Sequence, residues 1–512
     1  MVSKYKLTLC FLAVITLLYL LQGTRNFTSA DKLILDYSLE KESFVSNLFT
    51  VFSNKNDILS VEHFLNNSLN NITTLNVNNL ADSAQFDRQE KKTFEQNKSR
   101  NASLLKQETG CVSWTNIYKV SNPISNANNI HSDSMLFHQN RVVKEVNCRL
   151  LFDDNITEKA RAFQRMQQPL INVSPSIYLN VTKHCDKYIR ETGYITSSLT
   201  EEERLFPIAY SILVYKDIKQ VEMLLRSIYR PQNVYCIHCD VNADDHFRQA
   251  LNSIVGCFTN VFMASKSYKV EWGRIEVLLP EITCMSDLWK YANWKYFINL
   301  TGQEFPLRTN YELVKILKAY NGSNNVEGTI KRANLDRWPS QTKPPHNITL
   351  VKGSVHIVVN RHFVDYVLHS KISEEFLEWI RTNGVDVPDE TFFATLNHNP
   401  HLNIPGSYKG DRELDCEKKP FLTRFKNWGD YVYDWPCKGK RVRLICIFGI
   451  EDLPLLMTRQ ELFANKFHFD YQPYTYQCMD ELLFNRTRDE YYNILQFDTS
   501  MYQSLEFIKN KV

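Results

Sequence analysis

Two adjacent carboxylates, Asp389 and Glu390, are the strongest candidates for acid–base chemistry in this sequence. They follow a turn at residues 383–388 and stand where a helix is predicted from Thr391 to Leu396. The dipole and free amides of a first helical turn favour carboxylates, so the pair could simply cap the helix. A carboxylate fixed in this way beside a cleft could equally take a proton from a hydroxyl group. The local sequence leaves both roles open.

The sequence lacks a motif that often binds the metal of sugar-nucleotide enzymes. No two aspartates are spaced as Asp-x-Asp. If a nucleotide diphosphate is the leaving group, Lys or Arg must meet its charge. Arg443, within Arg441–Gly449, and Lys466, within Leu462–Phe467, are candidate cations, although either could be an ordinary surface charge. A glycine-rich phosphate loop, a Gly-x-Ser-x-Gly elbow and a His-Glu-x-x-His motif are also absent.

Cys236-Ile237-His238-Cys239 has the spacing of a redox pair or of half a zinc site. A redox pair needs its first thiol at a helix start, whereas Cys236 lies in a β-rich run from Val234 to His238. Alternation along a strand places Cys236 and Cys239 on opposite faces. Zinc needs about four ligands, and no second Cys/His pair stands at a suitable spacing. We therefore expect both cysteines to be structural.

The elements that would position a site are clearest between Phe206 and Pro306. Apolar runs of strand length alternate there with segments of helical spacing, Ile218 to Tyr229 and Ile275 to Tyr291. This alternation predicts a mostly parallel sheet covered by helices. Ligands of such sheets bind at the carboxyl ends of the strands. The expected ends are Val214-Tyr215, His238-Cys239-Asp240 and Thr301-Gly302.

Further elements are expected after this stretch. Strands are predicted at Val355 to Val359 and at Val442 to Phe448. Helical patterns cover Ser373 to Arg381 and a segment around Leu462 to Lys466.

Composition places the chain among globular proteins. It has 512 residues, of which 43% are hydrophobic and 12% aromatic, enough for a large core. Its 60 basic and 57 acidic side chains give a net charge of +3. Such a balance gives no reason to expect a nucleic acid or an acidic surface as partner.

Twelve cysteines and many Asn-x-Ser/Thr sequons point to the secretory pathway, where disulfides persist. Asn299 also fits the sequon pattern but lies in an expected core strand, so we expect it to be bare. Further sequons begin at Asn26, Asn71, Asn101, Asn155, Asn180, Asn347 and Asn485.

The amino terminus predicts a membrane anchor. Lys4 and Lys6 precede an apolar run from Leu7 to Leu21, which is short for a bilayer span, so a cleaved signal peptide is the alternative. No small-x-small cleavage site follows, which favours an uncleaved anchor with the rest of the chain lumenal. We expect a cytoplasmic tail at 1–6, a transmembrane signal-anchor at 7–23, a polar lumenal stem at 24–147 and a catalytic domain at 148–512.

Several long motifs together resemble a known enzyme family. They are FPIAYSILVYKD, RSIYRPQNVYCIHCD, CFTNVFMAS, ANWKYFINLTGQEFPLRTN, VPDETFFATL, LICIFGIEDLP and LFANKF. Their types and order are similar to those of core 2 type β-1,6-N-acetylglucosaminyltransferases, members of glycosyltransferase family 14. The likeness covers roughly Cys148 to the end of the chain.

This resemblance implies an α/β, GT-A-like single catalytic domain after an anchor and stem, in a single-pass type II protein of the Golgi membrane. It implies inverting transfer of N-acetylglucosamine from UDP-GlcNAc to the 6-hydroxyl of GalNAc in Galβ1-3GalNAc O-glycans on glycoproteins. No cofactor and no metal would be needed, which agrees with the missing Asp-x-Asp.

The resemblance also assigns roles to residues. Glu390 matches the catalytic base. Glu327 and Arg337 match acceptor-binding residues. The positions that match donor-binding residues are Leu213, Val214, Tyr215, Asp240, Val241, Asn242, Trp272, Arg443 and Lys466.

The family's disulfides are expected here as Cys148–Cys478, Cys185–Cys257, Cys236–Cys284 and Cys437–Cys446. Cys10 falls in the anchor, which leaves Cys111, Cys239 and Cys416 as an odd set. A leftover thiol among them could link two chains as a homodimer.

Three positions depart from the family pattern. Trp272 stands where a donor-side Tyr is expected, Asn334 where an acceptor-side Lys is expected, and Thr301 where a free Cys is expected. A glucosyltransferase that uses UDP-glucose on the same acceptor therefore stays open. So do a xylosyltransferase acting on protein serine and an anchored glycan-binding protein without turnover.

Overall fold

A six-stranded sheet runs through the computed structural model, which describes residues 118–120, 137, 141–167, 174–414, 419–428 and 435–512. β4, β3, β2 and β5 run parallel, whereas β8 runs antiparallel to its neighbours β5 and β7. The predicted α/β class is confirmed, and the sheet is mixed. In order across the sheet the strands are β4 (Val261–Met263), β3 (Val234–Cys239), β2 (Ile208–Val214), β5 (Tyr296–Thr301), β8 (Ile357–Asn360) and β7 (Asn325–Val326).

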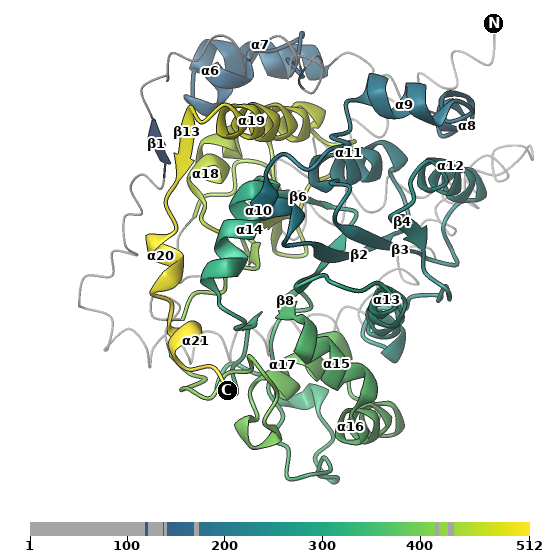
Figure 1. Ribbon diagram of the computed structural model, residues 1–512, viewed down its shortest axis with the longest axis vertical. Helices are drawn as coiled ribbons and strands as arrows, with labels where there is room; N and C mark the ends of the chain where they lie inside the picture. The colour runs from purple at the N-terminus through teal and green to yellow at the C-terminus, as the bar shows by residue number, and fades with distance from the viewer. Residues whose placement is uncertain (1–117, 121–136, 138–140, 168–173, 415–418, 429–434) are drawn as a thin grey trace, which may run out of the picture. The chain divides into compact units, whose positions relative to one another are not determined.

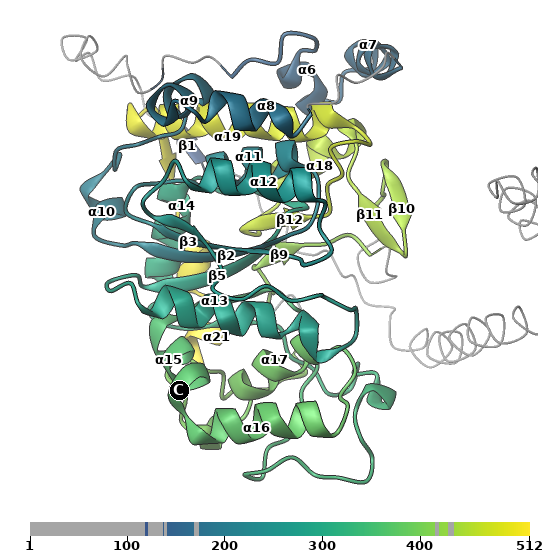
Figure 2. The same ribbon diagram turned by 90° about the vertical axis from the view of Figure 1, so that its right-hand side faces the viewer.

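Two buried layers cover the faces of this sheet. Apolar side chains alternate between the layers along each strand, as Tyr210 and Ala209 do on β2. One layer is built from α11 (Ile218–Ile228), α12 (Asp245–Val255) and α14 (Asn310–Ala319). The other is built from α13 (Leu279–Trp289), α15 (Arg361–His369), α16 (Lys371–Thr382) and α17 (Phe392–Asn397). Figure 2 shows α11 and α12 on one side of the sheet and α13 and α15 on the other.

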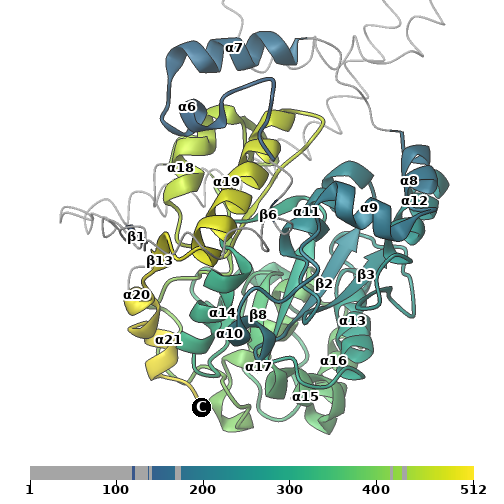
Figure 3. The same cartoon turned by 45° about the horizontal axis from the view of Figure 1, so that its top comes forward.

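A third core lies beside the main sheet. It contains a three-stranded sheet in which β12 (Phe463–Asn465) lies between β6 (Glu304–Pro306) and β9 (Arg424–Phe425). The helices α6 (Cys148–Phe152), α18 (Leu453–Thr458) and α19 (Pro473–Tyr491) pack on it, and Figure 3 shows them grouped together. A hairpin of β10 (Lys440–Val442) and β11 (Ile445–Ile447) adjoins this core.

Short elements complete the described part of the chain (Figure 1). β1 (Tyr118–Val120), within the predicted stem, pairs with β13 (Leu495–Phe497) near the carboxyl end. The Arg141 guanidinium donates to Asp480 on α19 at 2.9 Å, so a second piece of the predicted stem also contacts the catalytic part. The remaining α-helices are α7 (Ile156–Met166), α8 (Ser176–Val181), α9 (Cys185–Thr192), α10 (Glu201–Arg204), α20 (Ser500–Gln503) and α21 (Glu506–Lys509).

Two expected elements are wrong. The helix expected around Leu462 to Lys466 is strand β12, because its backbone pairs with β6 and β9 on either side. The single strand expected from Val442 to Phe448 is interrupted by a turn at Arg443-Leu444, so that this stretch contributes to a hairpin. The helices expected from Ser373 and from Thr391 are present as α16 and α17.

Three of the four expected disulfides are formed: Cys148–Cys478, Cys185–Cys257 and Cys437–Cys446. The fourth is not, since Cys236 and Cys284 are free, buried thiols. Because side chains alternate between the faces of β3, Cys236 and Cys239 point to opposite sides of the sheet, as expected. Cys236 faces α13 and contacts Cys284 there. Burial raises the pKa of the Cys284 thiol and contact with Cys236 raises it further, so this thiol favours its protonated form. Cys10, Cys111 and Cys416 lie outside the described residues.

The expected anchor at 7–23 lies outside the described residues. Among the helices that are described, none combines the length and apolarity needed to cross a membrane. The Asn155, Asn180 and Asn347 side chains are exposed, as glycosylation would require, whereas Asn26, Asn71 and Asn101 are not described. Asn299 is 1% exposed and its amide donates to the Val355 carbonyl at 2.8 Å, so it is unavailable.

A buried carboxyl group, Glu281 on α13, lies against the sheet. It accepts hydrogen bonds from the Ser211 hydroxyl and the Asn299 amide. Burial raises the pKa of Glu281 to about 7, although these hydrogen bonds oppose the shift. Between its usual pKa of 4.5 and about 7, the unfolded chain releases a proton that the folded chain retains. The free energy of unfolding therefore falls as the pH rises from 4.5 to about 7, and it stays lower at higher pH.

Glu281→Gln should weaken this pH dependence, because glutamine keeps a neutral side chain of the same shape. The measurement is the Tm by differential scanning fluorimetry at about pH 5 and at about pH 7.5. Between these two pH values, the Tm should fall by roughly 1–3 °C less in the variant than in the wild type. Glu378→Gln, which removes an exposed carboxylate of α16, should retain the wild-type loss. An unchanged pH dependence in Glu281→Gln would show that this carboxyl group does not hold the proton.

Candidate active site

Glu390 ends a 3₁₀ turn, η4 (Pro388–Glu390), that leads into α17. The preceding Val387 has φ +51°, a left-handed conformation that a β-branched residue rarely adopts. Hydrogen bonds fix this conformation: the Val387 amide donates to the Gly273 carbonyl at 2.9 Å, and the Glu390 amide donates to the Val387 carbonyl at 3.1 Å. Such strain costs about 1–3 kcal/mol and persists where surrounding structure enforces it. The backbone of Glu390 is therefore held rigidly.

The Glu390 carboxylate has one engaged oxygen. Its Oε2 accepts from the Arg337 guanidinium at 2.7 Å and lies 4.0 Å from the Lys352 ammonium. Its Oε1 has no hydrogen-bond partner among the residues that the structure describes. The ion pair therefore orients the carboxylate and leaves one oxygen available to accept a proton.

Glu390 borders a cavity of about 540 Å³. Glu327, another predicted site residue, also lines this cavity. Gly353 lies in the wall of the cavity, and its small size allows the backbone of Glu327 to approach closely. A Cβ at residue 353 would lie 2.3 Å from the Glu327 carbonyl oxygen. The Gly353 amide donates to the Glu390 carbonyl at 2.7 Å. Any side chain at residue 353 would clash with the Glu327 backbone and the Ala394 side chain.

Other lining residues make the cavity both charged and aromatic. They include Lys352, Lys426, Trp428 and Trp435. The Lys426 ammonium donates to the Ser354 hydroxyl at 2.8 Å. Burial lowers the pKa of Lys426, while the Glu327 and Glu390 carboxylates oppose that shift. A cavity with aromatic walls and polar groups of both signs suits a carbohydrate, which presents apolar ring faces and hydroxyl groups.

Asp389 has a different environment from Glu390. Its Oδ1 accepts from the Glu390 amide at 3.1 Å. Burial raises the pKa of Asp389 to about 7, and the Glu390 charge acts in the same direction. The two carboxyl groups are thus distinct: Asp389 bonds the backbone of the turn, and Glu390 borders the cavity.

The predicted donor turns lie at the carboxyl edge of the parallel strands. β2 has β3 as its neighbour on one side and β5 on the other. Since the chain continues from β2 to β3 and β5 lies on the opposite side, the strand order reverses here, which makes this edge a topological switch point. The Gly302 amide after β5 donates to the Leu213 carbonyl at 2.9 Å, and the Asp240 amide after β3 donates to the Val214 carbonyl at 3.0 Å. Tyr215 is 52% exposed at the same edge.

The Asp240 carboxylate organises the next turn. It accepts from the Asn242 amide at 2.7 Å and from the Val270 amide at 3.0 Å. The segment from Val270 leads to Trp272, which is 77% exposed, and to Gly273, whose carbonyl accepts from Val387. This segment therefore connects the Asp240 turn to the turn that holds Glu390. Val241 is 50% exposed, so apolar surface is accessible along this edge.

Arg443 lies at the tip of the β10–β11 hairpin. Arg443 and Leu444 form its two-residue turn with φ of +48° and +70°, a conformation that usually selects Asn or Gly. Leu444 is 71% exposed, so no apolar burial offsets its strain. Two consecutive strained residues on a surface hairpin are a sign of functional constraint.

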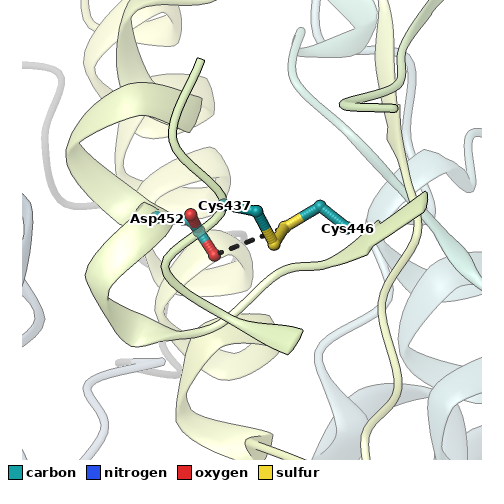
Figure 4. A group of neighbouring side chains, drawn as sticks. All are labelled: Cys437, Cys446 and Asp452. Atoms are coloured by element: carbon teal, nitrogen blue, oxygen red, sulfur yellow. Dashed lines mark hydrogen bonds between the residues drawn. A yellow bond between two sulfur atoms is a disulfide. The ribbon is translucent and has the colours of Figure 1, made fainter. Parts of the chain in front are cut away.

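The base of this hairpin is fixed by Asp452 and a disulfide. Within the part of the chain that the structure describes, Cys437, Cys446 and Asp452 are the one group whose spacing could suit a metal ion (Figure 4). Cys437 and Cys446 are bonded to each other and offer no thiolate, so we assign this group to structure. Asp452 accepts from the Lys438 and Gly449 amides, each at 2.8 Å, and so ties together the two ends of the hairpin.

Lys466 follows β12 and lies in the same region as Arg443. The Phe448 amide, just after β11, donates to the Lys466 carbonyl at 3.0 Å, and the Phe467 amide donates to the Gln303 carbonyl at 2.8 Å. Burial lowers the pKa of Lys466, Glu304 opposes the shift, and the Arg443 charge adds to it. The structure thus brings the two predicted cations within electrostatic reach of each other, and neither lines the Glu390 cavity.

Sequence reasoning missed the residues that support these groups. Lys352 and Lys426 lie on segments without a recognisable motif, and folding alone brings them to Glu390. Glu304, 0% exposed, accepts from Arg424 at 2.7 Å and lies 2.5 Å from the His356 ring nitrogen. The available signal was a glutamate directly before Phe305 and Pro306, at the end of an expected core strand, since a buried carboxylate needs partners. Asn334 is exposed and accepts from the Asp336 amide at 3.3 Å.

Comparison with known proteins gives one consistent family. A model of the Core-2/I-Branching enzyme family matches residues 208–456. A human beta-1,3-galactosyl-O-glycosyl-glycoprotein beta-1,6-N-acetylglucosaminyltransferase is 34% identical over 374 residues, which cover 66% of this chain and 85% of that enzyme. The Bos taurus enzyme of the same name is 37% identical over 332 residues, covering 60% and 76%. A Danio rerio relative, numbered 4 under that name, is 34% identical over 366 residues, covering 66% and 84%.

The match with the human relative extends beyond the region of the family model and spans most of that enzyme. The resemblance inferred from the motifs is confirmed. The chain belongs to the Core-2/I-Branching enzyme family, the glycosyltransferase family that its motifs resemble.

Proposed function

We propose that this chain transfers N-acetylglucosamine from UDP-GlcNAc, in β-1,6 linkage, to the GalNAc of Galβ1-3GalNAc O-glycans on glycoproteins. The observation that carries the proposal is Glu390 at the border of a cavity suited to a carbohydrate, with one carboxylate oxygen that no described residue binds. The names of the relatives support the donor and acceptor. A Golgi membrane location, with the catalytic part lumenal, belongs to the same proposal.

In the proposed reaction the acceptor glycan occupies the Glu390 cavity. Glu390 Oε1 takes the proton of the acceptor 6-hydroxyl as the 6-oxygen attacks the anomeric carbon of the donor sugar. The bond from that carbon to the UDP oxygen breaks on the opposite face, which inverts the configuration. Arg337 keeps the carboxylate oriented during the transfer, because it holds Oε2.

The departing UDP is proposed to bind at the switch point. Arg443 and Lys466 would take up the charge that develops on its diphosphate as the bond breaks. These cations support a metal-independent reaction, since they supply at this edge the charge that a divalent ion would otherwise supply. Tyr215, Val241 and Trp272 offer exposed surface for the uridine and the sugar.

Glu390→Gln should abolish turnover while leaving UDP binding nearly intact, because glutamine fills the same space and cannot take a proton. We expect kcat, measured as UDP release, to fall by ~10²- to 10⁴-fold. The Kd for UDP, measured by calorimetry, should change by less than about twofold. Glu378→Gln on α16 is the matched control and should keep full activity. Substantial turnover in Glu390→Gln would assign the base to another residue.

Arg443→Gly should weaken UDP binding without destabilising the fold, since glycine accepts φ of +48°. Loss of a charged contact predicts a Kd for UDP raised roughly 10- to 100-fold, with Tm changed by no more than about 2 °C. Leu444→Gly relaxes the same turn but keeps the cation, so it should retain UDP binding. Equal affinities in the two variants would remove Arg443 from the donor site.

A donor and acceptor screen in EDTA tests the proposed activity as a whole. The full chain should use UDP-GlcNAc with a Galβ1-3GalNAc acceptor and keep its rate after metal removal. Preference for UDP-glucose, or transfer to bare serine peptide, would indicate the glucosyltransferase or the xylosyltransferase instead. UDP-sugar binding without any transfer would indicate a glycan-binding protein.

A further inference from the structure

Lys216 is the second residue after β2, at the switch point where the donor is proposed to bind. It lies between Tyr215, whose ring centroid is 5.9 Å from the Lys216 ammonium, and Asp217, whose carboxylate is 3.4 Å away. Asp217 has φ +59°, which turns the chain from β2 into α11. The amino terminus of α11 therefore also faces this edge, and its free amides add positive potential there.

A buried glutamine, Gln220 in the first turn of α11, connects this edge to the Lys466 segment. Its Nε2 donates to the Gly302 carbonyl at 2.9 Å and to the Phe467 carbonyl at 3.2 Å. Its Oε1 accepts from the Phe469 amide at 2.8 Å. Gln220 is 0% exposed, so these bonds are shielded from water and hold Lys466 to His468 beside the end of β2.

Lys216 is part of a group of positive charges gathered from separate segments. Burial lowers the pKa of Lys466, and the charges of Lys216 and Arg443 act in the same direction. Burial also lowers the pKa of His468, and Lys216, Lys466 and Lys440 add to that shift. These groups come from the end of β2, the β10–β11 hairpin and the end of β12, so folding assembles them.

Few carboxylates balance this group. Asp217 and Asp470 face Lys216, and Glu304 faces Lys466. Glu304 is already engaged by Arg424 and His356. Like charges repel when they are brought together in a partly buried place, so an excess of cations favours an anion between them.

We infer that Lys216 is a third cation of the donor site and contacts the diphosphate of the nucleotide sugar together with Arg443 and Lys466. This inference rests on the proposed function. The Asp217 carboxylate holds the Lys216 ammonium at the strand end before the donor arrives. Lys216 contributes as a point charge, so it adds affinity for phosphate oxygens and none for the uridine ring.

Calorimetry with UDP and with uridine tests this role in the full chain. Lys216→Gln should raise the Kd for UDP roughly 5- to 20-fold and leave the Kd for uridine unchanged, because uridine lacks phosphates. Lys216→Arg should restore most of the UDP affinity. The dependence of UDP binding on salt, between about 0.05 and 0.5 M NaCl, should become shallower in Lys216→Gln. Lys371→Gln, which removes an exposed lysine of α16, is the matched control.

The outcomes separate this inference from the proposed function. If Lys216→Gln binds UDP like the wild type while Arg443→Gly loses affinity, Lys216 is not part of the site and the proposed function stands. If Lys216→Gln loses UDP and uridine affinity equally, its effect is on the fold of the site, and the inference is overturned. If the wild type binds neither UDP nor a UDP sugar, the proposed function is wrong, and the inference is wrong as well because it rests on that function.

Discussion

The hydrogen bond from the Gly302 amide to the Leu213 carbonyl holds together the edge on which the rest of the site depends. It joins the end of β5 to the end of β2, at the point where the strand order of the sheet reverses. Gln220 extends this junction to Phe467, so β12 ends at the same edge. Strands that run parallel thereby gather charged residues from distant parts of the sequence at one edge.

Strained backbone occurs at the candidate catalytic positions on either side of this edge. Val387 adopts a left-handed conformation directly before the turn of Glu390, and Arg443 does so at the tip of its hairpin. A hydrogen bond to the Gly273 carbonyl holds Val387 in place, and Asp452 fixes the base of the hairpin that carries Arg443. Such conformations cost stability, and here they lie next to the proposed base and at the proposed diphosphate-binding cation.

Much of this arrangement could be predicted from the sequence where the signal was local. The turn at Pro388 predicts that Asp389 and Glu390 are held in place, whereas only the resemblance to the family singled out Glu390 as the base. β12 was mistaken for a helix because its apolar residues fit both periods, and only its pairing with β6 and β9 decides the conformation. The β10–β11 turn was missed because Arg443-Leu444 replaces the glycine or asparagine of a usual tight hairpin. Lys216, like Lys352 and Lys426, acquires its surroundings only through the fold.

A crystal structure of the chain with UDP and the acceptor disaccharide tests the central claim most directly, namely that proton removal and leaving-group stabilisation are carried out by separate groups. We expect the acceptor 6-hydroxyl within hydrogen-bond distance of Glu390 Oε1, and the diphosphate in contact with Arg443 and Lys466. A diphosphate seated in the Glu390 cavity, or a 6-hydroxyl bound away from Glu390, would contradict the account.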